Sequence, residues 1–411
     1  MLTPLKYLVS DRITNGVGLP AEHENPEWPR YIRTTDIAGP RRLRDDVWYS
    51  QPPDLLNSAS VQQNDLLLTN AGMTVGKSYL RFSDEPAVYA GYLTRIRPDT
   101  RKADPRYLSY FTQSQPYWDQ INVGATRSTI DNFSSGKYQD LKIPLPPLDQ
   151  QRRIADMLDE ETARIDALIE KNRKAVDLLA RRLRSRRAQL LWPAEAAKAW
   201  TGNPLVAPPS AAPDVTRLQY VVPFRVAGGT PKSTNREFWA DDPDAGVPWF
   251  AVGDLKHGGT TVSPSRYVTP AGMEEANLSQ LPSGTILYAM YASIGKATIL
   301  QTKGVTNQAI LGLRPDSGLL AEYLFNWLLF TRPFAVELAR SNTQDNLNAD
   351  QVSRFTIRVP PVPEQRRVVE EIRSVEESLA SLETKVRRQE ELLTKRRQAL
   401  ITAAVTGEIE V

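Results

Sequence analysis

One stretch of this chain occurs twice, beginning IPLPPLDQQRRIADML at Ile143 and IRVPPVPEQRRVVEEI at Ile357. In each copy, prolines end an extended segment and precede an uninterrupted helical pattern of more than thirty residues. Because proline suits an extended segment or a first helical turn but not a helix interior, we expect helices to begin just past Pro147 and Pro363. A helix of about 40 residues, at about 1.5 Å per residue, is about 60 Å long. Its apolar stripe cannot be buried inside one small domain and needs a partner.

Apolar residues in both copies recur at spacings of three and four, which indicates a coiled coil. The seam predicted for the second copy is Val368, Ile372, Val375, Leu379, Leu382, Val386, Leu393 and Leu400, and the seam predicted for the first is Ile154, Leu158, Ile165, Leu168, Asn172 and Leu179. Asn172 is either a polar residue that fixes the register or an exposed residue beside a shifted stripe through Ile169, Val176 and Leu183. A pseudo-two-fold arrangement makes the two helices antiparallel, although the segment between them is long enough for parallel pairing.

The repeat extends upstream of the helices. LTPLKYLVSDRITNG at Leu2 returns as VTRLQYVVPFRVAGG at Val215, and Gly76-Lys77 is matched by Gly295-Lys296. The order of these matches is the same in both halves while their offset drifts between 213 and 219 residues, so the chain is a duplicated module with loop insertions. Short β-rich runs between Gly and Pro turns predict an α+β fold for each globular part. The predicted divisions are globular parts at 1–145 and 215–358, long helices at 146–191 and 359–411, and a Pro- and Ala-rich, semi-extended linker at 192–214.

Composition excludes several classes of protein. The absence of cysteine removes disulfides, thiolate catalysis and thiolate zinc sites. No apolar run reaches the roughly 20 residues that span a bilayer, and the first residues lack the apolar core of a signal peptide, so a cytoplasmic location is expected. The net charge is only +3, so any charge that binds DNA must be localised.

Positively charged and amide side chains gather in the loops of both globular parts. Arginine and lysine contact phosphates or guanine, and asparagine and glutamine contact adenine. Taken singly, a residue of this kind is more often a solvated loop residue than a base reader, but the clustering of these residues in both modules favours nucleic acid. The candidates for DNA contact are Arg30, Arg33, Arg41, Arg42, Arg44, Asn70, Lys77, Arg127, Lys232, Arg236, Lys256, His257, Lys296, Asn307, Gln308 and Gln344. The arginine-rich helix ends, such as 181–187, either complement the helix macrodipole or contact DNA.

The segment AGMTVGKS at Ala71 is similar to a phosphate-binding loop. Such a loop needs a following helix and a hydroxyl for magnesium, whereas a strand-like segment follows here and the duplicate has Ala297 in place of the hydroxyl. We therefore interpret it as a turn between strands, with Lys77 and Lys296 pointing at a polyanion. No catalytic residue and no metal site is predicted. A nucleotide-using enzyme and a coiled-coil assembly scaffold that does not bind DNA remain as alternatives.

The duplicated organisation, the two proline-rich segments and the glycine turns TNAGMTVGKS and YAMYASIGKA resemble the specificity subunit of type I restriction-modification systems. The first copy departs from the usual pattern, with Asp149-Gln150-Gln151 where the second has Pro363-Glu364-Gln365. The resemblance implies a non-catalytic subunit in which two target-recognition domains each read one half of a bipartite, asymmetric DNA sequence. The paired helices would set the unread spacer between the halves.

The same resemblance implies the partners of the chain. It would hold two methyltransferase (modification) subunits and two restriction subunits. S-adenosylmethionine and ATP with magnesium would be bound by those partners, and this chain would bind no cofactor itself.

Overall fold

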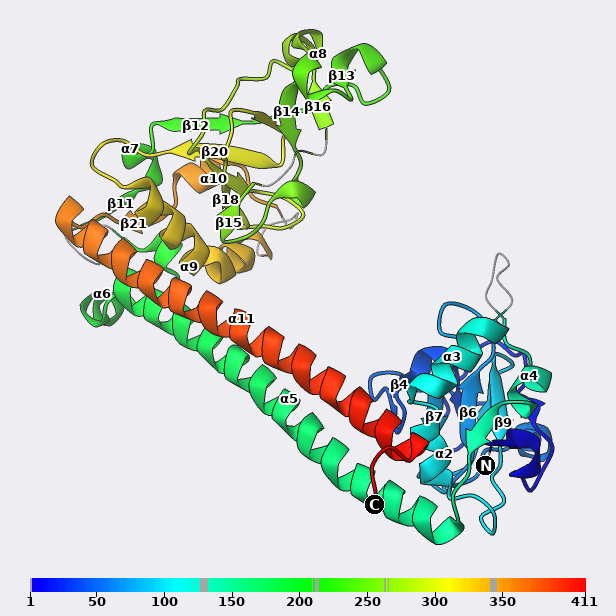
Figure 1. Ribbon diagram of the computed structural model, residues 1–411. Helices are drawn as coiled ribbons and strands as arrows, with labels where there is room; N and C mark the ends of the chain where they lie inside the picture. The colour runs from blue at the N-terminus through cyan, green and yellow to red at the C-terminus, as the bar shows by residue number, and fades with distance from the viewer. Residues whose placement is uncertain are drawn as a thin grey trace. The chain divides into compact units, whose positions relative to one another are not determined.

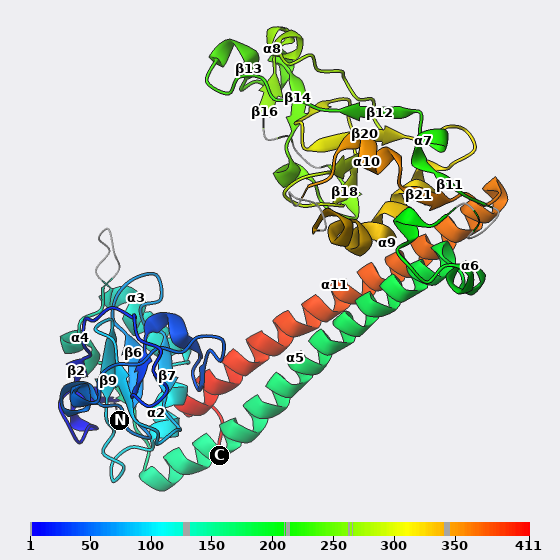
Figure 2. The same cartoon turned by 180° about the vertical axis from the view of Figure 1, so that it is seen from behind.

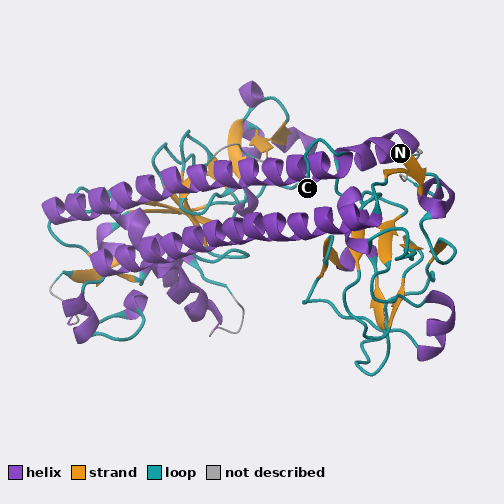
Figure 3. Ribbon diagram, turned by 60° about the horizontal axis from the view of Figure 1, so that its bottom comes forward, coloured by secondary structure: helices purple, strands orange, loops and turns teal. Residues whose placement is uncertain are grey.

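A computed structural model describes residues 2–125, 132–208, 210, 214–261, 264, 266–340 and 346–411 of the chain. The chain forms two compact units, one of Met1–Lys174 with Lys385–Val411 and the other of Ala175–Thr384. Each unit holds one globular domain of short strands, helices and long loops (Figure 3). The unit boundaries fall inside both long helices, so each unit contains part of each helix.

The two long helices are α5 (Leu148–Leu191) and α11 (Val362–Thr406). α5 begins directly after Pro147, as predicted, whereas α11 begins at Val362, one residue before Pro363 and not past it. Proline supplies no backbone N–H, and the first turn of a helix does not need one, so Pro363 is accommodated in the first turn of α11.

The helices pair in antiparallel fashion within each unit (Figures 1 and 2). In the first unit, Ile154 near the start of α5 shares a buried cluster with Ile401 near the end of α11. In the second unit, Leu191 at the end of α5 shares a buried cluster with Val368 near the start of α11. These contacts confirm the predicted antiparallel pairing.

Ion pairs flank the contact between the two helices. The pairs are Asp166 with Arg397 at 3.4 Å and Arg173 with Glu390 at 3.4 Å in the first unit, and Arg186 with Glu371 and Arg187 with Glu376 in the second. The partners on α11 have lower residue numbers for the later residues of α5 than for the earlier ones, which is the order that antiparallel helices require. Pairs that remain accessible to water contribute about 0–1 kcal/mol each, so the apolar seam is the main source of stability.

The seam differs from the prediction at two leucines. Leu168 is 45% exposed and Leu382 is 40% exposed, so neither lies in the contact. The stripe of α5 that is buried or half-buried comprises Leu158, Ile165, Ile169, Asn172, Val176, Leu179 and Leu183. This stripe follows the 3.6-residue period of a straight helix, which drifts about 20° per heptad from the 3.5-residue repeat that we assumed. Asn172 lies on the stripe, and its side-chain nitrogen is buried without a hydrogen bond to any described residue.

The first globular domain is built around an antiparallel sheet in the order β2-β9-β6-β7. Leu66 and Leu68 of β6 face one buried cluster and Leu67 faces another, so both faces of the sheet are covered. The strands of the domain are β1 (Leu2–Pro4), β2 (Thr14–Asn15), β3 (Arg30–Ile32), β4 (Ile37–Gly39), β5 (Arg42–Leu43), β6 (Leu66–Thr69), β7 (Ser78–Leu80), β8 (Ala87–Tyr89), β9 (Leu93–Ile96) and β10 (Lys142–Pro144). Its helices are α1 (Leu56–Ala59), α2 (Pro105–Phe111), α3 (Gln115–Gly124) and α4 (Ser135–Gln139).

The second globular domain repeats this frame with additions. Its main sheet has the order β12-β20-β17-β18-β15, and a second sheet has the order β13-β16-β14-β19. Its strands are β11 (Val215–Arg217), β12 (Phe224–Ala227), β13 (Trp239–Ala240), β14 (Val247–Phe250), β15 (Gly259–Thr260), β16 (Arg266–Val268), β17 (Ile286–Ala289), β18 (Ala297–Ile299), β19 (Val305–Thr306), β20 (Ile310–Arg314) and β21 (Thr356–Arg358). Its helices are α7 (Leu218–Val221), α8 (Pro270–Glu275), α9 (Ala321–Arg340) and α10 (Ala349–Ser353).

Two details show that the frame itself is duplicated. The first strand of each domain pairs antiparallel with the strand that precedes the long helix, β1 with β10 and β11 with β21. A glycine follows the second strand of each frame, and a Cβ atom there would lie 2.0 Å from a carbonyl oxygen, that of Tyr89 for Gly16 and that of Thr306 for Gly228. No other residue fits so close to the neighbouring backbone.

The linker is not the extended tether that its composition suggested. It contains α6 (Ala194–Ala199), and Trp192 and Leu205 are buried in the core of the second unit. Thr356 of β21 donates a hydrogen bond of 2.6 Å to the Pro204 carbonyl. The apolar residues among the prolines and alanines are buried against α9 and β21, and this burial offsets the cost of ordering the segment.

The described residues contain no helix with the length and apolar character that crossing a bilayer requires. They also contain no group of three or more metal-ligating side chains.

We expect Leu191→Ala to lower the free energy of unfolding of the second unit by about 3 kcal/mol, because it removes a side chain with no exposed surface from the core. The matched control is Leu178→Ala on the same helix, where the leucine is 51% exposed and the loss should stay below about 0.5 kcal/mol. Denaturant unfolding followed by tryptophan fluorescence measures both. Equal losses would show that the end of α5 is not anchored in the second domain.

Candidate nucleic-acid interface

The two Gly-Lys turns are β-hairpin turns and not phosphate loops. Gly76 and Gly295 have φ of 85° and 71°, which favours glycine, and each turn leads into a strand, β7 or β18. The Lys77 ammonium group donates to the Ile37 carbonyl, and that of Lys296 donates to the Val252 carbonyl at 3.4 Å. Each half-buried lysine thus gives one hydrogen bond to a backbone carbonyl of its own domain and keeps its charge, so contact of either with a polyanion stays a prediction. A nucleotide-binding role for these turns loses its basis.

Asn70 organises the loops at one end of the first sheet. Its side-chain nitrogen donates to the Gly91 carbonyl at 3.1 Å and to the Thr94 hydroxyl at 3.2 Å, and only 6% of the residue is exposed. Its backbone nitrogen donates to the Tyr92 carbonyl at 2.9 Å. Asn70 therefore ties the β6–β7 turn to the β8–β9 turn and is itself inaccessible to a base.

Two exposed apolar residues lie on the turns that Asn70 joins. Met73 is fully exposed, and Tyr92 is 68% exposed. Neither residue is among the cationic and amide candidates for DNA contact. A large apolar side chain at a glycine-flanked turn is the signal that could have identified them, since such residues are usually buried.

The first arginine cluster is only partly free to bind a ligand. Arg33 makes an ion pair of 2.7 Å with Asp36 and lies over the Tyr49 ring at 4.1 Å, and the bonds to Asp36 raise the pKa of the guanidinium group. Arg30 donates to the Arg44 carbonyl and lies 4.9 Å from the centre of the Trp48 ring. These arginines shape the loop that carries them.

Two arginines of this cluster keep more of their charge exposed. Arg42 has 76% of its side chain exposed and lies 3.9 Å from the highly exposed Asp45. Arg44 pairs with Asp46 at 2.7 Å, although 46% of its side chain remains exposed. Water weakens both pairs, so a phosphate can compete with either aspartate.

Arg41 attaches the first domain to the long helix. Its guanidinium group makes an ion pair with Asp159 of α5 and lies over the Tyr110 ring at 4.7 Å. It also lines a pocket of about 330 Å³ together with Arg397 of α11. Its position in the sequence beside Arg42 does not reveal this role.

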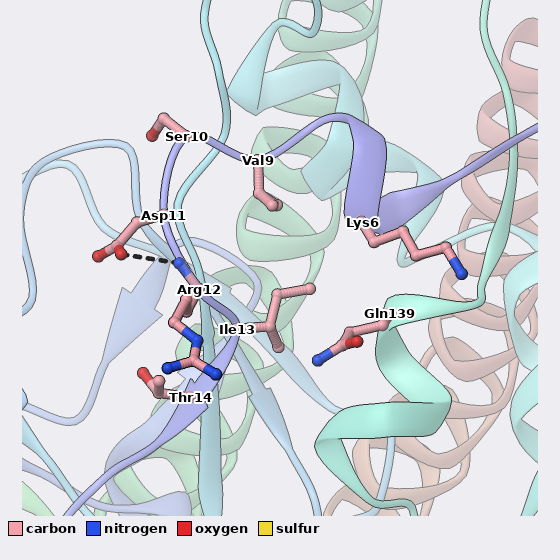
Figure 4. Close-up of a pocket in the computed structure, with 8 residues that line it drawn as sticks. All are labelled: Lys6, Val9, Ser10, Asp11, Arg12, Ile13, Thr14 and Gln139. Carbon is pink, nitrogen blue, oxygen red and sulfur yellow. Dashed lines mark hydrogen bonds between the residues drawn. The ribbon is translucent and has the colours of Figure 1, made fainter.

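A polar groove of about 730 Å³ lies along the N-terminal segment of the first domain (Figure 4). The Asp11 carboxylate pairs with Arg95 at 2.6 Å, and a hydrogen bond from the Arg12 backbone nitrogen is the main cause that lowers the pKa of Asp11. Lys6 pairs with Asp140 at 2.9 Å. The exposed Arg12 side chain brings a further positive charge into the groove, and the candidate set did not include it.

In the second domain, Lys232, Arg236 and Lys256 are exposed. Lys232 lies 4.0 Å from Glu275, a distance at which water screens the attraction. These three residues are the accessible cations of the predicted set in this domain.

The amide candidates of the second domain have partners in neighbouring loops. The Asn307 side-chain oxygen accepts a hydrogen bond of 3.2 Å from the Ala309 backbone, and that of Gln308 accepts one from the Thr230 hydroxyl. Gln308 is exposed, so the other hydrogen-bonding groups of its side-chain amide are accessible to solvent. Arg127 and Gln344 lie outside the described residues.

His257 is held neutral at physiological pH. Partial burial, with Arg332, Arg187 and Lys296 nearby, lowers the pKa of its imidazole to about 4. Its Nδ1 accepts a hydrogen bond of 3.3 Å from the Ala297 backbone, which also requires the unprotonated form. His257 therefore acts as a neutral hydrogen-bonding group and contributes no positive charge.

The geometry of both domains agrees with comparisons with known proteins. The family model of the type I restriction modification DNA specificity domain matches residues 21–177 and 215–392. The MjaIX type I restriction enzyme specificity subunit of Methanocaldococcus jannaschii is 29% identical over 149 residues, which cover 35% of this chain and only 33% of that protein.

Two solved structures share the fold over the whole chain. One comes from work on the structural basis of complex assembly and conformational transition of the type I R-M system. It has a TM-score of 0.69 and 18% identity, and the match covers 100% of this chain and 98% of the other. The other is the HsdS subunit from Thermoanaerobacter tengcongensis, with a TM-score of 0.55, 17% identity and coverage of 100% and 97%. The duplicated arrangement of domain and long helix is thus the arrangement of these proteins.

The lowered pKa of His257 predicts a pH dependence of stability. The unfolded imidazole binds a proton near pH 6.5 and the folded one only near pH 4, so stability present at pH 7 is lost as the pH falls between these values. His257→Gln keeps an acceptor for the Ala297 N–H and should flatten this loss. Unfolding at pH 7 and pH 5 measures the effect, and His23→Gln, in the other unit, is the control. An unchanged pH dependence in His257→Gln would contradict the assignment.

Proposed function

Because the chain belongs to the type I restriction-modification DNA specificity family, we propose that it is the subunit that selects the DNA sequence on which a type I complex acts. Each globular domain is a target-recognition domain that reads one half of a bipartite, asymmetric site. A coiled-coil scaffold without DNA binding has no comparable support.

The observation that carries this proposal is a duplicated frame with unlike surfaces. Both domains have a parallel strand pair, β3 with β8 and β14 with β19. Around that pair the first domain has the β4–β5 hairpin, whereas the second adds β13, β16 and α8. Two copies of one frame that present different loops suit two half-sites of different sequence.

The exposed cations identified above supply sequence-independent affinity. Arg12 and Arg42 in the first domain, and Lys232, Arg236 and Lys256 in the second, are placed to neutralise phosphates. Base reading then falls to the loops that differ between the domains, since phosphate contacts position a protein and base contacts specify its sequence.

The paired helices set the length of the spacer between the half-sites. An α-helix resists stretching, because each turn is closed by backbone hydrogen bonds. The subunit itself is non-catalytic and works in the cytoplasm. We assign S-adenosylmethionine to two modification subunits, and ATP with magnesium to two restriction subunits, all held by this chain.

The modular reading is tested by exchanging residues 215–357 for the equivalent part of another specificity subunit. Genome-wide base methylation, measured with the cognate modification subunit present, should show a motif altered in one half only. Exchange of residues 2–143 is the matched control and should alter the other half. Deleting the gene should abolish the motif, and an exchange that alters both halves would contradict independent reading.

The spacer role predicts the effect of a paired deletion. Removing residues 169–175 of α5 together with residues 388–394 of α11 takes about 10 Å from the helices, which corresponds to roughly three base pairs of duplex. The methylated motif should keep both halves and lose about three base pairs of spacer. Replacing the same two heptads by others of equal length is the control, and an unchanged spacer after deletion would show that the helices do not set it.

A further inference from the structure

A buried glutamine joins the first domain to the start of its long helix. Gln151, in the first turns of α5, has only 1% of its surface exposed. Its side-chain oxygen accepts a hydrogen bond of 2.9 Å from the Asp104 backbone nitrogen. Its side-chain nitrogen donates to the Pro146 carbonyl at 2.9 Å and to the Lys102 carbonyl at 3.2 Å. One side chain thus binds the segment before α2 and the segment before α5 at once.

The second domain has the same arrangement at Gln365, which has no exposed surface. The side-chain oxygen accepts a hydrogen bond of 2.9 Å from the Leu320 backbone nitrogen. The side-chain nitrogen donates to the Pro360 carbonyl at 2.7 Å and to the Gly318 carbonyl at 2.9 Å. In both modules the glutamine oxygen accepts from one backbone N–H and the glutamine nitrogen donates to two backbone carbonyls at equivalent positions. The residues that precede the two glutamines, Asp149-Gln150 and Pro363-Glu364, differ.

Given the proposed function, we infer that Gln151 and Gln365 are positioning residues that fix the angle at which each target-recognition domain leaves its helix, and so fix the spacer length that the subunit accepts. An amide is the one side-chain group that offers a neutral acceptor and two donors together. A change in the angle moves the reading loops of a domain along the DNA without altering the loops themselves.

The first domain has further bonds that hold this angle. Arg106 of α2 makes ion pairs with Asp156 at 2.7 Å and with Asp159 at 3.0 Å, both on α5. The Tyr110 hydroxyl donates to Asp159 at 2.7 Å, and Arg41 pairs with the same carboxylate. Gln151 is therefore one of several side chains that hold the first domain against α5.

The matching face of the second domain is open. In the repeat, Glu322 occupies the position equivalent to Arg106 of the first module. On α11, Glu370 is equivalent to Asp156 of α5, and Arg373 is equivalent to Asp159. A groove of about 570 Å³ lies there, lined by these three residues and by Arg366 among others. The ion-pair network of Arg106 is thus replaced by open space at this face. Arg358 of β21 still pairs with Glu364 of α11 at 3.0 Å, but this pair is less extensive than the network of Arg106, so the angle of the second domain depends more strongly on Gln365.

The test compares Gln365→Met with Gln151→Met in the full complex. Methionine is similar in length to glutamine but lacks its donors and acceptor. The readout is the methylation rate of duplexes that carry both half-sites with spacers of the native length or one base pair longer or shorter. For Gln365→Met we expect selectivity for the native spacer to fall roughly fivefold, the factor that one net hydrogen bond contributes. For Gln151→Met the fall should be smaller, and base preference within each half should not change.

Gln389→Met, at an exposed glutamine of α11, is the matched control and should leave spacer selectivity unchanged. If Gln365→Met folds poorly, Gln365→Asn, which retains an amide one methylene shorter, should lower selectivity in the same direction. Unchanged spacer selectivity in a folded variant, or altered base preference instead, would overturn the inference. Failure of the parent complex to methylate any such duplex would instead refute the proposed function.

Discussion

The apolar stripe of each long helix is the constraint on which the structure depends. A helix of this length exposes more apolar surface than its own domain can cover, so α5 and α11 cover each other. Antiparallel pairing then carries the end of each helix to the start of the other. The end of α11 completes the core of the first domain, and the end of α5, with the linker, completes that of the second. Each unit is therefore composite.

This arrangement separates the invariant parts of the molecule from the variable ones. The terminal strand pairs, the close-packed glycines Gly16 and Gly228, and the buried amides of Gln151 and Gln365 occur in both modules with the same geometry. The loops that surround the parallel strand pairs differ. A frame that is held by backbone contacts and glycines tolerates new loops, so the loops of one module can change while the frame and the other module stay the same.

The sequence predicted the large features because repetition and period are properties of the chain itself. Duplication and the approximate helix starts were accessible in this way, whereas antiparallel pairing followed only from assuming a pseudo-two-fold arrangement. Side-chain roles were not, since Lys77, Arg33 and Arg41 carry the charge expected of a DNA contact but find internal partners that only folding brings near. Leu168 was misplaced because a straight helix departs from the heptad period. The linker was misread because its composition conceals the buried Trp192 and Leu205.

The composite first unit has a consequence for synthesis of the chain. The second unit is one continuous segment, Ala175–Thr384, and all of its contacts become available before translation ends. The first domain is made earlier, yet part of its core is supplied by Ile401, Ala404 and Val405. The apolar surface around Tyr107 and Leu158 therefore remains exposed to water until the end of α11 is made, while more than two hundred further residues emerge from the ribosome. Of the two domains, the one synthesised earlier completes its core later, and in that interval its uncovered apolar surface is exposed to chaperones and to aggregation.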